Sequence, residues 1–275
     1  MSESGTSIAV ISPQGGAICE LLLDDFEIVP KIALNNPLDF VYGHVLAPWP
    51  NRLEDGEFSY AGNTYRFDHL DAQNNKNHGL VLSRNLEIRE QKPHSAVLGY
   101  RFGEDDGYPF EVDLELHYEL TENGLEVTAT ASNLGVDAPF AIGFHPYLLT
   151  GESFGLNASF SHKSSQNERM LPTGMSEISG LTLDQNSLEL ESLDHCFQGA
   201  SELVISRPDG EIVVEALENL PYFMLYRPSQ RMSEAGALIA VEPQSTMANA
   251  FRDNLEDCIL PSGQKRNYRF AIRKR

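Results

Sequence analysis

Positive charge is scarce in this chain. Its 275 residues contain 20 lysines and arginines against 40 aspartates and glutamates, which gives a formal net charge of −20. Binding to phosphate groups depends on clustered lysines and arginines. We therefore expect neither nucleic acid nor a membrane as a partner. The charge also disfavours a heavily anionic ligand, unless the fold assembles a local basic pocket.

Cysteines and long apolar runs are scarce too. The cysteines Cys19, Cys196 and Cys258 are odd in number and widely spaced, which fits neither a disulfide framework nor a paired zinc motif. No apolar run approaches the ~20 residues that a membrane helix needs. The first residues lack the basic and apolar regions of a signal peptide. We expect reduced thiols and a cytoplasmic protein.

Motifs of several enzyme classes are also missing. The sequence has no glycine-rich phosphate loop, and its histidines include no pair at a recognised metal spacing. It therefore predicts no cofactor and no metal. Residues 151–155 match the Gly-x-Ser-x-Gly pattern of hydrolases, but that pattern requires a helix after the serine. Residues 156–160 alternate like an extended segment instead, which disfavours a hydrolase.

The chain is rich in short β-like segments. Hydrophobic residues make up 41% and charged residues 22%, enough for a sizeable core. Residues 112–120 alternate between apolar and polar, and residues 57–67 resemble a hairpin joined through Ala61-Gly62-Asn63, while convincing helical periodicity is missing. Other strand-like segments are residues 7–12, 96–102, 125–132, 138–144, 203–205, 212–215, 222–226, 238–242 and 267–272.

This pattern predicts an all-β fold, an antiparallel sandwich rather than an array of βαβ units. No repeat, low-complexity tract or linker divides the sequence, so we expect residues 1–275 to form a single domain. The polar residues 161–186 are the best candidate for a long loop or an inserted excursion.

Two ionisable residues stand inside apolar, strand-like segments. In residues 140–145, alternation places the large apolar side chains on one face and His145 on the other, behind Ala141 and Gly143. These small neighbours leave room for something to sit against the imidazole. Glu242 shares its face with Ala240 in the same way. A histidine and a carboxylate displayed like this are candidate catalytic residues, as an acid–base couple.

Further polar and aromatic candidates lie in turns and at segment ends. Taken singly, each is more often structural than functional. Taken together with the couple, they supply what a neutral sugar requires: charged and amide groups for vicinal hydroxyls, and an aromatic face for the C–H side. These candidates are Trp49, Asn51, Arg52, His78, Asp194 and Arg227.

Five ordered motifs give the chain a resemblance to a known family. They are Trp49-Pro50-Asn51-Arg52, Asn77-His78-Gly79, Gly143-Phe144-His145-Pro146-Tyr147, Asp194-His195-Cys196-Phe197 and Val241-Glu242-Pro243. In this order, over roughly residues 45–255, they resemble the aldose 1-epimerase (galactose mutarotase-like) family. The resemblance implies a β-supersandwich of galactose mutarotase type, with a sugar-binding cleft on its concave sheet and no cofactor.

The resemblance also implies residue roles. By motif, Glu242 resembles the general base and His145 the general acid of the family. The sugar-binding residues would be Asn51, Arg52, His78 and Asp194. The carboxylate takes the proton from the anomeric hydroxyl while an imidazolium protonates the ring oxygen, so that the ring opens and closes on its other face. An unperturbed histidine pKa of ~6.5 suits this exchange near neutrality.

The expected function is therefore an isomerase, a mutarotase that interconverts the α and β anomers of a free hexose or a close derivative. Leu80 after Gly79 and Met224 depart from the commonest family pattern, so galactose specificity is not implied.

Two alternatives stay open. One is a non-catalytic carbohydrate-binding or sensing domain on the same fold. The other is an epimerase of a phosphorylated or sulfonated sugar, which requires a basic cluster. The candidates for that cluster are Arg84, Arg89, Arg227 and Arg231. We expect a sugar as the small-molecule partner, and a monomer or weak homodimer.

Overall fold

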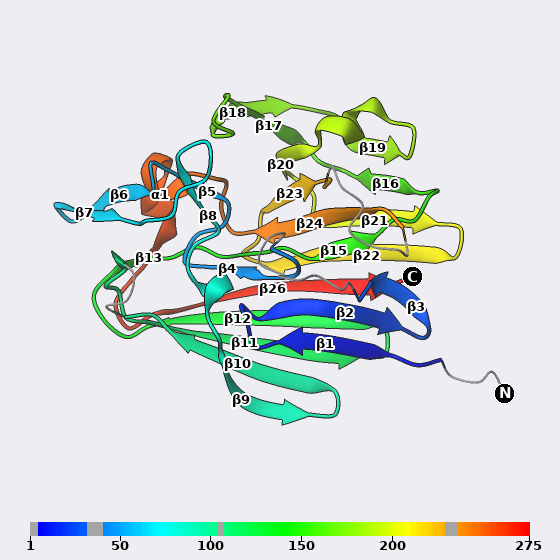
Figure 1. Ribbon diagram of the computed structural model, residues 1–275, viewed down its shortest axis with the longest axis horizontal. Coiled ribbons are helices and arrows are strands. Elements are labelled where there is room, and N and C mark those ends of the chain that lie inside the picture. Colours follow the sequence, from blue (N-terminus) through cyan, green and yellow to red (C-terminus); the bar gives the residue numbers. More distant parts are fainter. Residues whose placement is uncertain (1–4, 32–40, 104–106, 229–235) are drawn as a thin grey trace.

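The computed structural model describes residues 5–31, 41–103, 107–228 and 236–275, and two large antiparallel sheets dominate them (Figure 1). The nine-stranded sheet contains, in spatial order, β19 (Leu181–Asp184), β16 (Gly155–Ala158), β21 (Glu202–Arg207), β22 (Gly210–Glu218), β26 (Lys265–Lys274), β12 (Gly124–Asn133), β11 (Val112–Thr121), β10 (Ser95–Arg101) and β9 (Glu87–Lys92). The eight-stranded sheet contains β18 (Pro172–Glu177), β17 (His162–Gln166), β20 (Asp194–Gln198), β23 (Tyr222–Tyr226), β24 (Leu238–Gln244), β14 (Gly143–Phe144) and β4 (Val45–Leu46), and β15 (Tyr147–Leu149) also pairs with β24.

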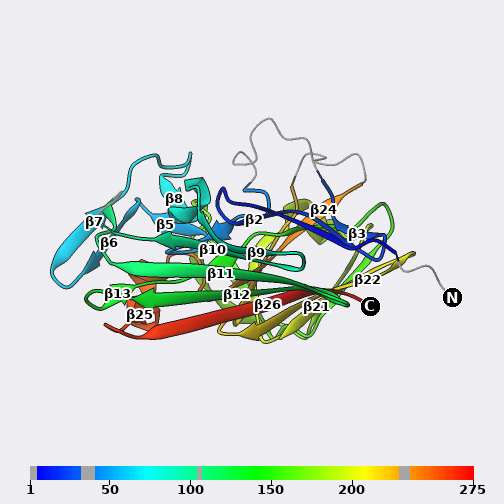
Figure 2. The same ribbon diagram turned by 90° about the horizontal axis from the view of Figure 1, so that it is seen from below.

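The two sheets pack face to face around a hydrophobic core. The ring of Phe144 in β14 lies 4.5 Å from the ring of Phe270 in β26, measured between centroids. On β11 the apolar side chains Val112, Leu114 and Leu116 are buried and alternate with partly exposed polar ones. Figure 2 shows β11, β12 and β26 running side by side across one face of the molecule. The predicted all-β sandwich is confirmed.

Residues 161–186 were expected to form a long loop or an inserted excursion, and the loop alternative is wrong. This segment forms β17, β18 and β19, which lie at the top of Figure 1. The chain passes from β16 in the nine-stranded sheet to β17 and β18 in the other sheet, and then returns with β19. β18 and β19 are edge strands, and few of their side chains are buried. Backbone pairing without much apolar burial leaves little hydrophobic alternation in the sequence, which is why the strands were missed.

The predicted hairpin over residues 57–67 is confirmed, with a shorter loop. Tyr60 pairs with Asn63, so the loop consists of Ala61 and Gly62, whose φ angles are 49° and 79°. Positive φ at both residues gives the twist that two-residue hairpins favour.

Smaller sheets and short helical turns complete the described part of the chain. The sheets pair β1 (Ile8–Ser12), β2 (Ala17–Leu23) and β3 (Phe26–Val29); β5 (Arg52–Glu54) and β8 (Asn75–Asn77); β6 (Glu57–Tyr60) and β7 (Asn63–Arg66); and β13 (Ala138–Pro139) and β25 (Ile259–Leu260). The helical elements are α1 (Ala250–Asp253) and the 3-10 turns η2 (Val81–Ser83), η4 (Leu188–Ser192) and η5 (Leu255–Cys258). In the described ranges, no helix has the length and apolar character needed to cross a bilayer.

The segment predicted as one strand over residues 138–144 is interrupted. It forms β13 and β14, and the amides of the residues between them donate to groups outside the strands. The amide of Ala141 donates to the carbonyl of Pro48 at 2.7 Å, and that of Ile142 donates to Ser245 Oγ at 2.9 Å. The predicted alternation still holds, because Phe140 and Phe144 both contact aromatic rings of β26.

Candidate active site

An open cavity of about 330 Å³ lies against the eight-stranded sheet. Its walls come from β20, β23 and β24, from the segment after β14, and from the small β5–β8 sheet. Six predicted site residues line it together: Asn51, Arg52, His78, His145, Asp194 and Glu242. Side chains that are up to about 190 residues apart in the sequence therefore meet in one hollow.

Strand register explains how the sheet presents the acid–base couple. Gly143 pairs with Gln244, and Tyr147 pairs with Ala240. The same antiparallel register places His145, midway between Gly143 and Tyr147, opposite Glu242 on β24. Directly opposed side chains share a face of the sheet. The Nε2 atom of His145 accordingly lies 3.2 Å from Oε1 of Glu242.

The couple is almost completely buried. His145 is 4% exposed and Glu242 is 2% exposed. Gln244, two residues along β24, donates its amide to Oε2 of Glu242 at 2.9 Å. One carboxylate oxygen is therefore held by a neutral donor and the other faces the imidazole. This arrangement fixes the direction of the carboxylate.

Burial determines how the couple holds protons. Loss of hydration lowers the pKa of His145 from its ordinary value of 6.5 to about 3. Burial raises the pKa of Glu242 well above its usual range, the charge of Asp194 adds to this shift, and Gln244 and Arg52 oppose it. A net charge on the couple is thus disfavoured, and the state with one proton shared by the two groups is favoured over a wide pH range. The sequence-based expectation of an unperturbed imidazole pKa is wrong.

Gly143 does not make room for a ligand in the way the sequence suggested. A Cβ atom at this position would lie 2.8 Å from Cβ of Pro50 and 3.0 Å from Cγ of Gln244. The missing side chain therefore admits protein atoms. One of them belongs to the glutamine that holds Glu242, so Gly143 contributes to the position of the carboxylate.

Arg52 links two parts of the cavity lining, β5 and β20. Its Nη2 atom lies 3.7 Å from Oδ2 of Asp194, and its Nε atom lies 4.0 Å from Oδ2 of Asp71. Asn51 accepts hydrogen bonds from the backbone amide of Arg52 at 2.8 Å and from its Nη1 atom at 3.3 Å. The guanidinium therefore has one hydrogen bond, to Asn51, and two carboxylates at ion-pair distance. Burial raises the pKa of Asp194, and the charge of Arg52 opposes that shift.

Asn51 and His78 both adopt left-handed backbone conformations, with φ angles of 56° and 62°. The amide of His78 donates to the carbonyl of Asn51 at 2.8 Å. Such strained conformations are enriched at functional sites. The rings of His78 and His145 meet edge to face with centroids 5.5 Å apart. Burial lowers the pKa of His78 well below its ordinary value, so its imidazole is neutral.

Trp49 is not where its predicted role requires it to be. The indole is 3% exposed and does not line the cavity. It packs against Phe67 and Phe251, with ring centroids 4.7 Å and 5.7 Å away. A ring enclosed in this way has no face free for a sugar, so the expected stacking role is replaced by a core role.

Several lining residues were not predicted as site residues: Asn77, Tyr147, Met224 and Tyr226. Strand alternation could have found Tyr147, two residues after His145, and Tyr226, two residues after Met224. No sequence pattern indicated that Asp71 contacts the site. Its carboxylate accepts a hydrogen bond from Nδ2 of Asn77, a lining residue, at 3.2 Å.

The arginines considered for an anionic substituent do not gather at this cavity. Arg84, Arg89 and Arg227 are not among its lining residues, and Arg89 donates to Asp113 on the nine-stranded sheet at 2.8 Å. Arg231 lies outside the described residues. Within the same ranges, no three His, Cys, Asp or Glu side chains converge as ligands of a metal ion would.

Comparison with known proteins places these features in a family. The family model described as aldose 1-epimerase matches residues 1–273. The uncharacterized protein YihR of Escherichia coli K12 is 28% identical over an alignment of 284 residues, gaps included. The alignment covers 98% of this chain and 91% of YihR.

Solved structures share the fold. A putative aldose 1-epimerase of Escherichia coli K12 aligns with a TM-score of 0.82 at 20% identity, covering 98% of this chain and 96% of its own. A galactose 1-epimerase of Lactobacillus acidophilus NCFM aligns with a TM-score of 0.80 at 19% identity, covering 100% and 92%. At this level of identity, the two structures support the fold alone.

Proposed function

The chain belongs to the aldose 1-epimerase family, and we propose that it is a mutarotase that interconverts the α and β anomers of a free hexose or a close derivative. The observation that carries the proposal is the contact between His145 and Glu242, 3.2 Å apart on the wall of a cavity of about 330 Å³. That volume falls in the range of pockets that enclose small ligands.

The proposed reaction moves one proton in each direction. Glu242 takes the proton from the anomeric O1 hydroxyl while His145 delivers a proton to the ring oxygen O5. The C1–O5 bond breaks, and its electron pair stays on O5 as C1 and O1 form the aldehyde. Rotation about C1–C2 turns the aldehyde over. O5 then attacks the other face of C1, O1 regains a proton from Glu242, and His145 recovers the proton of O5.

Throughout this cycle the couple holds a single proton. Ring opening starts with the proton on His145 and leaves it on Glu242. In the free protein the lowered pKa of His145 and the raised pKa of Glu242 place the proton on Glu242, beside a neutral imidazole. The proposal therefore requires that the proton moves to His145 when the sugar binds. The two states have the same net charge, so this transfer needs no proton from the solvent.

The wall that carries Arg52 would bind the sugar hydroxyls. Arg52 offers a fork of donors, and Asp194 offers acceptors 3.7 Å from it. Asn51, Asn77 and His78 lie beside them. In this scheme the polar wall binds the sugar and the buried couple transfers the protons. Ring opening then needs no further group, and we propose a reaction without a cofactor.

Anomer exchange is the direct test. Freshly dissolved α-D-glucose and α-D-galactose are followed by polarimetry, and their exchange is followed by NMR, with and without the protein. Acceleration that saturates with sugar concentration supports the proposal. Saturable binding without acceleration identifies a carbohydrate-binding domain instead. Acceleration confined to phosphorylated or sulfonated hexoses identifies an anionic substrate.

A further inference from the structure

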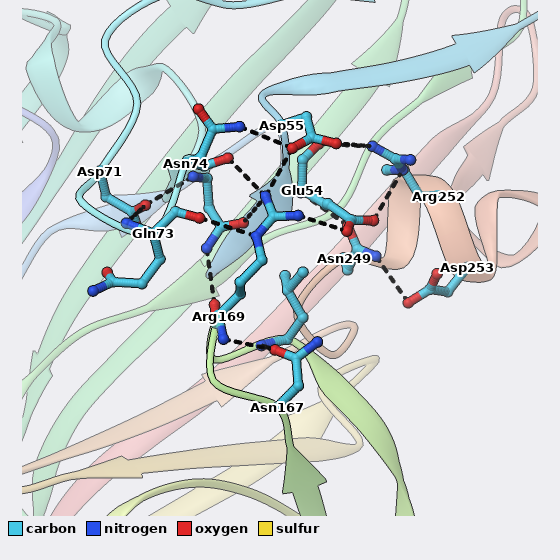
Figure 3. Close-up of polar contacts among 12 residues, drawn as sticks. Glu54, Asp55, Asp71, Gln73, Asn74, Asn167, Arg169, Asn249, Arg252 and Asp253 are labelled. Atoms are coloured by element: carbon cyan, nitrogen blue, oxygen red, sulfur yellow. Dashed lines mark hydrogen bonds and ion pairs between the residues drawn. The ribbon is translucent and has the colours of Figure 1, made fainter.

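A turn outside the cavity is tied to the wall that carries Arg52. This turn, residues 167–171, joins β17 to β18, and Figure 3 shows Arg169 reaching from it to the acceptors around β5 and β8. Its Nη1 atom donates to Glu54 Oε1 at 2.9 Å, and Nη2 donates to Asp55 Oδ1 at 2.8 Å. Further acceptors are the carbonyls of Gln73 at 3.0 Å and Asn74 at 3.0 Å, and Oδ1 of Asn75 at 3.3 Å.

The connection runs in both directions. Asn75, which is 0% exposed, donates its amide to the carbonyl of Arg169 at 2.9 Å. Asn167 in turn accepts from the amides of Arg169 at 2.9 Å and Leu171 at 3.1 Å. The turn therefore has hydrogen bonds within itself as well as to its neighbours. The internal hydrogen bonds restrict its conformational freedom, so less freedom is lost when the turn holds its neighbours in place.

Asp71 connects the residues that contact Arg169 with two residues that line the cavity. Its Oδ1 atom accepts from the amides of Gln73 at 2.9 Å and Asn75 at 2.7 Å, the same residues that contact Arg169. Its Oδ2 atom accepts from Asn77 Nδ2 at 3.2 Å and lies 4.0 Å from Arg52 Nε. Arg52 and Asn77 pair directly across β5 and β8, and both line the cavity.

The acid–base couple is held by other elements. Glu242 belongs to β24, and His145 follows β14. None of the Arg169 contacts described above involves either residue or the Gln244 that orients Glu242. A disturbance that starts at Arg169 should therefore reach the binding wall first. The couple meets that wall only through the charge of Arg52 on Glu242 and the ring of His78 on His145.

We propose that Arg169 is a positioning residue for sugar binding: through residues 71–77 it holds Arg52 and Asn77 in the arrangement that receives the sugar. The inference rests on the proposed mutarotase function, since it assigns that cavity to the sugar. The effect belongs to binding, so it should appear in KM and in the dissociation constant and leave kcat unchanged.

The test compares Arg169→Gln, Arg169→Lys and a control, Arg101→Gln. Arg101 is an exposed arginine that donates to Glu111 at 2.6 Å on the nine-stranded sheet. Displacements below ~1 Å at a binding group cost less than 10²-fold, and we expect R169Q to raise KM for D-galactose or D-glucose about 10-fold with kcat within about twofold. R169K retains the charge without the planar fork, so its KM should fall between those of R169Q and the wild type. R101Q should change neither constant.

A merely structural role predicts a different result. It would lower the melting temperature and the fraction of active protein, and hence the apparent kcat, with KM unchanged in both Arg169 variants. That outcome would overturn the inference. A second variant, Asn75→Ala, tests the path. If Arg169 acts through residues 71–77, N75A should raise KM and R169Q should add little to it, whereas fully additive effects would contradict the path.

The two proposals fail separately. Wild-type acceleration with unchanged KM in R169Q removes the positioning role and leaves the mutarotase function. If the wild type binds D-galactose in titration calorimetry but does not accelerate its anomer exchange, the catalytic proposal falls. The positioning role is then judged by whether R169Q weakens that binding about 10-fold. Absence of any hexose binding to the wild type refutes both.

Discussion

Replacing Glu242 with glutamine removes the proposed base at almost constant shape. Glu242 is 2% exposed, and Gln244 donates to one of its oxygens at 2.9 Å. The amide of a glutamine can keep that contact by turning its carbonyl oxygen toward Gln244, so we expect the fold and the cavity to survive. An amide cannot accept the O1 proton. A general base is worth about 10²- to 10⁴-fold in rate, which corresponds to roughly 3–5 kcal/mol of transition-state stabilisation.

The expected result of E242Q is a fall in kcat of about 10²- to 10⁴-fold with KM changed by a few-fold. Polarimetry of fresh α-D-glucose or α-D-galactose measures the rate, after subtraction of the exchange in buffer. Glu111→Gln is the matched control, because Glu111 is an exposed residue that contacts Arg101 and does not line the cavity. If E242Q keeps more than half of the wild-type rate, the base lies elsewhere.

Two further predictions follow from burial. Because burial lowers the pKa of His145 to about 3 and raises that of Glu242, the couple gains a second proton only near pH 3 and loses its single proton only above the usual range of a carboxyl group. The acid limb of the pH profile of kcat/KM should therefore have an apparent pKa near 3, and an acid limb at the ordinary carboxyl pKa of ~4.3 would contradict this. Trp49→Leu should lower the free energy of unfolding in urea by roughly 3 kcal/mol with KM unchanged, because the indole packs on Phe67 and Phe251; a raised KM at normal stability would restore the stacking role.

The sequence predicted the sandwich because its central strands alternate strongly. β11 buries every second side chain, and this period of two is visible without coordinates. β18 and β19 escaped notice because edge strands can form from polar residues once a neighbour supplies the hydrogen bonds. In β24 every residue is buried. Such a strand has no alternation to read, so its one ionisable residue was the visible signal.

The sequence identified most residues of the site, but it did not show how they are arranged in space. His145 and Glu242 stood out as ionisable residues in apolar segments, but their 3.2 Å contact follows from a strand register that only the fold establishes. The burial of Trp49 could not be predicted from the sequence, because the residues next to it in the chain are compatible with either an exposed or a buried indole. The Arg169 contacts join residues 94 to 115 positions apart. A short sequence motif cannot predict contacts between residues that are so far apart in the chain.

A crystal structure of the E242Q protein with a bound hexose tests the central claim most directly. The proposed mechanism requires a pyranose in the cavity, with its O1 atom within hydrogen-bonding distance of residue 242, its O5 atom within the same distance of His145 Nε2, and its hydroxyls on Arg52 and Asp194. A hexose bound there with C1 directed away from both residues would contradict the account, as would a hexose bound at another surface while this cavity stays empty.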